Sequence, residues 1–93
     1  MDTDLNNIEA NKKILITTIG KIIHQKRINL SKGINKFSIE YDIGNGLLSR
    51  LEKGNTDTQI TTLWKLANAF NIKFSDLAIE IEKELPDNFN FYE

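Results

Sequence analysis

The sequence predicts an all-α fold built from five helices. Apolar residues recur at spacings of three and four along most of the 93 residues, which is the period of an amphipathic helix. The only proline is Pro86, so no strong helix breaker interrupts this pattern before the last residues. A hydrophobic content of 40% supports one compact domain with a modest core and leaves no room for a large catalytic cleft.

The first two expected helices are separated by a turn over residues 29–33. The first should run from about Ile8 or Asn11 to Asn29, with an inward stripe of Leu15, Ile19, Ile22 and Ile23. The second should run from about Ile34 to Tyr41. Its buried face follows the i, i+3, i+7 spacing of Ile34, Phe37 and Tyr41.

Three further helices complete the expected fold. Gly44 or Asn45 should cap the third, which Gly54 ends. The run ITTLWKLANAF predicts a fourth helix with a buried stripe of Ile60, Leu63, Leu66, Ala67 and Phe70. Ser75 is the expected cap of a fifth helix, SDLAIEIEKEL, which Pro86 closes.

One segment also fits a strand. The residues FSIEYDIGNG alternate between apolar and polar, and Asn45-Gly46 is a favoured hairpin turn. The following LLSRLEK does not alternate, and a lone hairpin among helices would have no sheet to join. The helical interpretation is therefore preferred.

The segment LLSRLEKG, residues 47–54, is the most informative in the chain. On a helix, Gly46, Ser49, Arg50 and Lys53 share a small polar face, which is suited to a DNA groove. Glu52 falls on the opposite face, among leucines. Because burial of a lone carboxylate is costly, Glu52 should have a cationic partner elsewhere.

LSRLEKG, ITTLWKLANAFNI and SDL together resemble the Cro and lambda-repressor type helix-turn-helix, or XRE, family over about residues 15–77. The resemblance implies a lambda-repressor-like domain with the helix-turn-helix at the second and third helices. It also implies an ion pair between Arg27 and Glu52. The family's alanine in the second helix falls on Ser38, and the chain departs from the family pattern at Ile34, Asp42, Gly44 and Gly46.

The resemblance implies a sequence-specific regulator of double-stranded DNA, with repression as the expected outcome and no enzyme activity. The expected base-reading positions are Asn45, Gly46, Ser49 and Arg50, where Gly46 would allow close approach of the backbone. Asparagine can pair with adenine and arginine with guanine. The expected phosphate contacts are Asn35, Lys36, Lys53, Asn55 and Thr56.

Charge distribution agrees with a nucleic-acid partner better than the net charge of −1 does. Residues 12–53 carry nine basic and three acidic side chains, whereas both flanking segments are acidic. There is no cysteine, and His24 is the only histidine, so no metal site, catalytic residue or cofactor is expected. No segment predicts a membrane span or a signal peptide, so a cytoplasmic location is expected.

The expected organisation is an N-terminal extension (residues 1–10), the DNA-binding domain (11–85) and a C-terminal tail (86–93). The tail contains Phe89, Phe91 and Tyr92, which should fold back on the domain or contact a protein partner. The resemblance favours a homodimer on a palindromic operator. Two alternatives are an antitoxin that holds a toxin through this tail and a protein-interaction module that no longer binds DNA.

Overall fold

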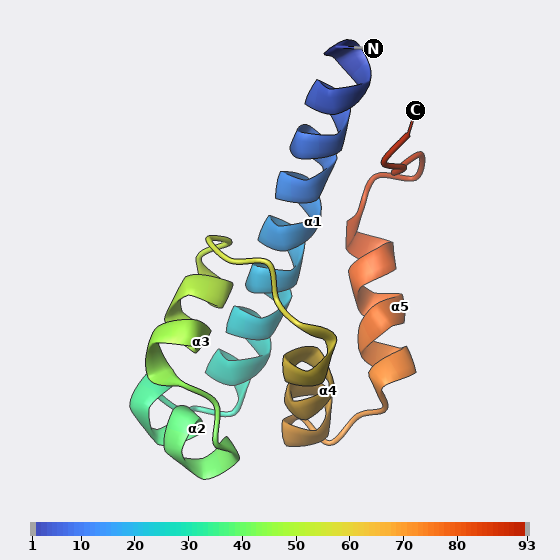
Figure 1. Ribbon diagram of the computed structural model, residues 1–93. Helices are drawn as coiled ribbons and strands as arrows, with labels where there is room; N and C mark the ends of the chain where they lie inside the picture. The colour runs from blue at the N-terminus through green and yellow to red at the C-terminus, as the bar shows by residue number, and fades with distance from the viewer. Residues whose placement is uncertain (1, 93) are drawn as a thin grey trace.

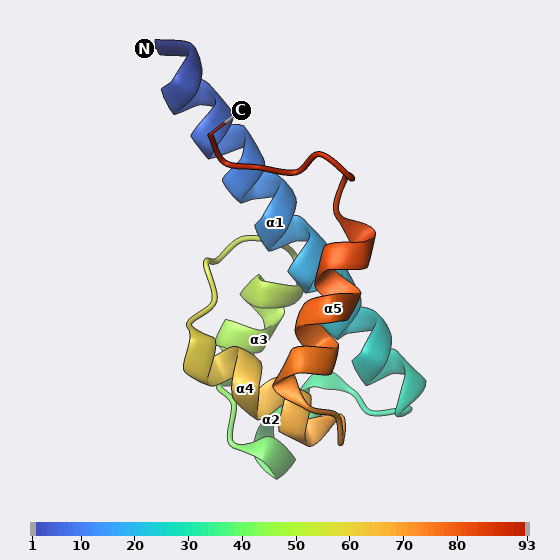
Figure 2. The same ribbon diagram turned by 90° about the vertical axis from the view of Figure 1, so that its right-hand side faces the viewer.

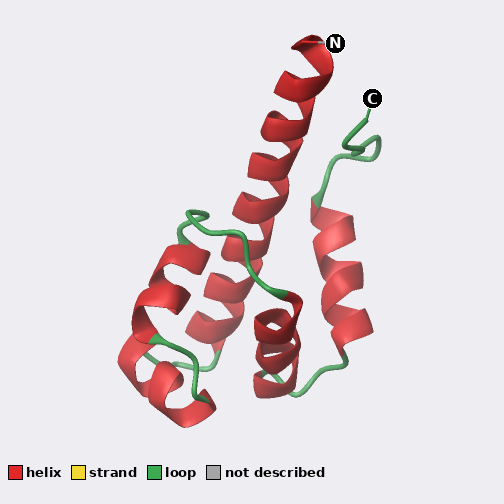
Figure 3. Cartoon of the chain, in the orientation of Figure 1, coloured by secondary structure: helices red, strands yellow, loops and turns green. Residues whose placement is uncertain are grey.

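The computed structural model describes residues 2–92 and contains helices α1 (Asp2–Asn29), α2 (Ile34–Tyr41), α3 (Asn45–Glu52), α4 (Ile60–Ala69) and α5 (Phe74–Glu84). Figure 3 shows helices joined by loops, and no strand occurs within this described range. The all-α prediction is thus confirmed. The hairpin alternative is wrong, because the alternating segment forms the end of α2, the following turn and the start of α3, and its residue Ile39 is 83% exposed.

Helix α1 is the long element against which the others are arranged (Figure 1). It begins at Asp2, earlier than the predicted start at Ile8 or Asn11. The chain has no glycine or proline upstream of the predicted start that would stop the helix there. The N-terminal part of α1 extends beyond α3 and α4, and α5 lies beside the following part of α1 (Figures 1 and 2).

The core lies where α1, α3, α4 and α5 meet, with α2 closing one end. Ile23, Phe37, Leu48, Leu66 and Leu77 are fully buried in it. The remaining predicted stripe of α1, Leu15, Ile19 and Ile22, packs against this core while staying partly accessible. Most of the apolar positions that the helical period predicted are therefore buried or packed against the core, and their burial is the main driving force for such a fold. None of the helices in residues 2–92 combines the length and apolar character needed to cross a membrane.

Two local predictions around α4 and α5 are wrong. Ile60 was expected in the buried stripe, but it is the first residue of α4 and is 56% exposed. Ser75 was expected to cap α5, whereas the helix begins at Phe74 with Lys73 as its N-cap residue. The earlier start places the Phe74 ring on the ring of Trp64, stacked at 4.7 Å between centroids.

The tail folds back on α1. The side-chain amide of Asn11 donates a hydrogen bond to the backbone oxygen of Asn90 (2.8 Å). Phe89 and Phe91 are half-buried and pack edge to face, while Tyr92 remains 83% exposed. Figure 2 shows the tail returning beside the N-terminal part of α1. Of the two fates expected for these aromatic residues, the structure shows the first.

Candidate nucleic-acid interface

The position of α3 depends on a close backbone contact with α1. A β-carbon added at Gly20 would lie 2.4 Å from the backbone oxygen of Leu51 and 2.9 Å from that of Glu52. Only glycine therefore lets the two helices approach this closely. Beyond the end of α3, Gly54 has a φ of 72° and packs on Thr17 of α1. These contacts fix the C-terminal end of α3 on α1.

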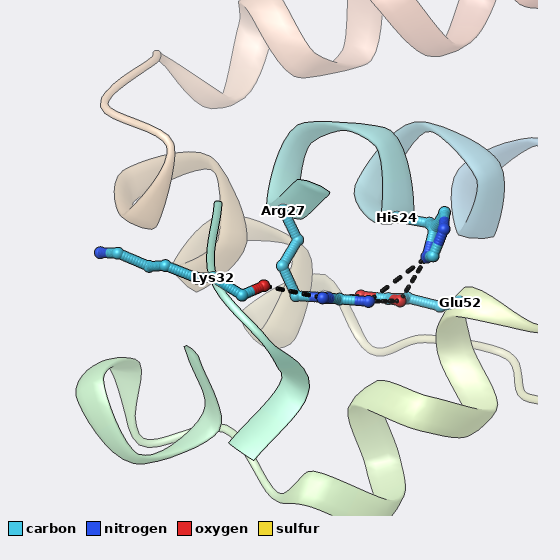
Figure 4. Close-up of polar contacts among 4 residues, drawn as sticks. All are labelled: His24, Arg27, Lys32 and Glu52. Carbon is cyan, nitrogen blue, oxygen red and sulfur yellow. Dashed lines mark hydrogen bonds and ion pairs between the residues drawn. The ribbon is translucent and has the colours of Figure 1, made fainter. Parts of the chain in front are cut away.

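The ion pair expected from the position of Glu52 ties the same two helices together (Figure 4). Arg27 donates from Nε to Glu52 Oε2 (2.7 Å) and from Nη2 to Oε1 (2.8 Å). Its remaining terminal nitrogen, Nη1, donates to the backbone oxygen of Lys32 (2.8 Å). Both charged side chains are buried, with 8% of Arg27 and 5% of Glu52 exposed. The guanidinium binds the Glu52 carboxylate in a bidentate arrangement. It thereby joins the end of α1 to the end of α3, and its third hydrogen bond joins both to the loop before α2.

Burial and pairing act in opposite directions on Glu52. Burial alone would raise the pKa of its carboxyl group, but hydrogen bonds from Arg27 and His24 outweigh this effect and hold the pKa below its ordinary value. The hydrogen bond to Glu52 raises the pKa of the Arg27 guanidinium against the effect of burial. The pair is therefore fully ionised at neutral pH.

His24 is a member of this cluster that the sequence did not reveal. The sequence excluded it only as a metal ligand, and half of its side chain is exposed. Its Nδ1 nevertheless lies 2.8 Å from Glu52 Oε1 and donates to it. The available signal was its position three residues before Arg27, on the same face of α1.

Anchoring one face of α3 leaves its other face exposed. Asn45, Gly46 and Arg50 are exposed and Ser49 is half-buried, so all four predicted base-reading residues are accessible. Arg50 makes no ion pair among the described residues. Glu52 is the only acidic residue in α3, and Arg27 and His24 hold it away from the exposed face. The exposed face of α3 is thus polar and carries net positive charge.

The first turn of α3 is joined to α2 through two side chains. Asn45 Nδ2 donates a hydrogen bond to Asn35 Oδ1. An asparagine amide has two donor hydrogens and one acceptor oxygen, so this bond leaves Asn45 one N–H and its oxygen. These two groups are what the edge of an adenine requires in the major groove. Asn35, expected only as a phosphate contact, thus also orients Asn45, one of the predicted base-reading residues.

A model of the helix-turn-helix family, HTH_3, matches residues 23–77, from the last turns of α1 to the first turn of α5. The chain belongs to the Cro/C1-type helix-turn-helix (XRE) family. Helices α2 and α3 are its helix-turn-helix, and the chain is a DNA-binding regulator of this kind. Comparisons with curated proteins and with solved structures give no significant match.

The turn of this helix-turn-helix keeps its geometry without the glycine usual in the family. Asp42 adopts the left-handed conformation, with φ of 53° and ψ of 51°, and its backbone N–H bonds to the oxygen of Ser38. Aspartate tolerates this region better than most other residues with a side chain. The N-cap residue of α3 is Gly44, which was one of the two predicted caps.

The five residues expected at DNA phosphates lie at the ends of this motif. Asn35 and Lys36 are in the first turn of α2 and are exposed. Lys53, Asn55 and Thr56 follow α3, and only Thr56 is half-buried. They flank the exposed face of α3 in sequence on both sides, as positioning contacts do in this class of motif.

Proposed function

We propose that this protein is a sequence-specific repressor that reads double-stranded DNA with the exposed face of α3. The observation that carries the proposal is the attachment of α3 by one face only. Its buried side is fixed on α1 by Gly20 and by the Arg27–Glu52 pair, while Asn45, Ser49 and Arg50 stay accessible. A reading helix held rigidly on its domain presents its side chains in one geometry, which is what base recognition needs.

Two side chains supply most of the expected specificity. Asn45, oriented by Asn35, can bond the N7 and N6 groups of adenine. Arg50 can bond the O6 and N7 groups of guanine with its planar guanidinium. Each pair is worth about 1–3 kcal/mol of discrimination against a wrong base. Ser49, on the same face, can bond either kind of base.

Phosphate contacts supply affinity without sequence information. Lys36 and Lys53 carry positive charge beside the reading face, and Asn35, Asn55 and Thr56 offer uncharged donors. The N-terminus of α3 contributes as well, because its cap residue Gly44 has no side chain and its first turn has no acidic residue. Its free N–H groups therefore remain available to a phosphate.

Repression and dimerisation belong to the same proposal. A domain that occupies an operator excludes the transcription machinery from overlapping DNA, and this requires no further surface. Two copies related by two-fold symmetry would read a palindrome whose half-sites lie about 34 Å apart. The proposed location is the cytoplasm, where such operators are accessible.

The antitoxin alternative rests on the aromatic tail, which is partly occupied by its contacts with α1.

The direct test is selection of binding sites from random DNA duplexes by the full chain. A palindromic motif containing adenine and guanine in each half-site is the expected result, and the absence of any enriched motif would refute the proposal in favour of the interaction module. Co-purification of a small neighbouring protein would instead support the antitoxin.

Two variants separate reading from positioning. Arg50→Ala should reduce the preference for guanine at one position by about 5- to 150-fold, the equivalent of 1–3 kcal/mol. Lys53→Ala should weaken binding to all sequences alike and lower the salt dependence by about one ion. Lys83→Ala, at the exposed end of α5, is the matched control and should change neither property.

A further inference from the structure

The side chain of Arg50 lies against Gly46, one helical turn before it. A β-carbon built on Gly46 would be 3.1 Å from Arg50 Nη1, and no other atom outside its immediate chain environment lies within 4 Å. The guanidinium therefore occupies the space that a side chain at residue 46 would fill. Helical side chains lean toward the N-terminus of their helix, which explains why Arg50 reaches back over the preceding turn.

The backbone does not require glycine at this position. Gly54 is the only glycine with positive φ among the described residues, so Gly46 has a conformation open to any L-residue. Glycine within a helix is nevertheless less favourable than alanine by about 1 kcal/mol. The advantage of glycine at this position is that no side chain lies beneath the Arg50 guanidinium.

We infer that Gly46 is a specificity-determining residue, because it sets the position from which Arg50 reads DNA; this rests on the function proposed above. With residue 46 bare, the guanidinium lies over the first turn of α3, the turn that also carries Asn45. A side chain at residue 46 displaces the guanidinium outward. Because bidentate pairing with guanine tolerates little displacement, a shift of this kind weakens the contact or moves it to another base pair.

The test compares base preferences of the wild type, Gly46→Ala, Gly46→Val, Arg50→Ala and the Gly46→Val/Arg50→Ala double variant on the selected duplex. Gly46→Val should lower the guanine preference at the Arg50 position at least tenfold or transfer it to another position. The adenine preference assigned to Asn45 and the affinity for scrambled DNA should stay within about twofold. Gly46→Ala should have a smaller effect, because the far end of a flexible arginine can move by a few tenths of an ångström.

The double variant tells whether Gly46 acts through Arg50. In the Arg50→Ala background, Gly46→Val should cause no further change in base preference, and an additional loss there would overturn the inference. It would also be overturned if Gly46→Val kept the full guanine preference that Arg50→Ala removes. A wild type that selects no sequence would refute the proposed function itself, so the two failures are distinguishable. Melting temperatures of Gly46→Ala at or above the wild-type value verify that α3 is intact.

Discussion

Replacing Glu52 by glutamine is expected to destabilise the domain strongly. The side chains of Glu52 and Arg27 are 5% and 8% exposed, so the substitution leaves a buried guanidinium without its counter-charge. The amide oxygen of glutamine can still accept a hydrogen bond, but it cannot replace both carboxylate oxygens. Breaking a buried ion pair on one side costs about 3–5 kcal/mol. Because glutamine retains one acceptor, the expected loss in free energy of unfolding is about 3 kcal/mol, the lower end of that range.

For a domain of this size, about 3 kcal/mol corresponds to a fall in melting temperature of roughly 12–24 °C. Circular dichroism melts of the wild type and variant at pH 7 and moderate salt measure this difference. Glu40→Gln is the matched control, because Glu40 pairs with Lys32 at the same 2.8 Å but is 41% exposed, and its loss should shift the midpoint little. If Glu52→Gln lowers the melting temperature no more than Glu40→Gln does, the structural role assigned to the pair is refuted.

Three further substitutions or conditions test the same fold. The pKa of Glu52 is lowered from 4.5 in the folded protein, so the stability that its charge contributes is present above pH 4.5 and is lost as the pH falls through the lowered pKa. The melting temperatures of the wild type and Glu52→Gln should therefore converge in acid. Ser38→Ala should raise the free energy of unfolding by about 1 kcal/mol in urea titrations, because it removes a buried hydroxyl that has no hydrogen-bond partner among residues 2–92, and a loss of stability would disprove this. Gly20→Ala should lower the free energy of unfolding by about 2–3 kcal/mol, because the new β-carbon would clash with the backbone oxygen of Leu51. Gly33→Ala, which adds its β-carbon in open space, should change stability little, and equal effects of the two substitutions would contradict the close contact between α1 and α3.

Much of the fold was predictable because it depends on local pattern. The apolar stripes that predicted α1 to α4 supply Ile23, Phe37, Leu48 and Leu66, which are fully buried. The ion pair began from an equally local observation, a carboxylate on the apolar face of α3. Its partner, Arg27, came from the family resemblance, because a helical wheel does not show which distant charge approaches.

Features that depend on distances between helices were not predictable. In the sequence, Gly20 is simply a glycine inside a predicted helix. The structure gives it a role, because a β-carbon added there would lie 2.4 Å from the backbone oxygen of Leu51. The stacking of Phe74 on Trp64 joins α5 to α4, and a contact between two helices cannot be predicted from the pattern within either one. Gly46 was expected only to allow close approach of the backbone, whereas the structure shows the Arg50 guanidinium lying over it.

Sequence reading by α3 is measured most directly by the ratio of the dissociation constants for a scrambled duplex and the selected duplex, determined at physiological salt. A ratio of about 10³ or more is predicted for the wild type, and a smaller ratio for Arg50→Ala. A ratio near one would show that α3 does not read sequence, whatever the absolute affinity.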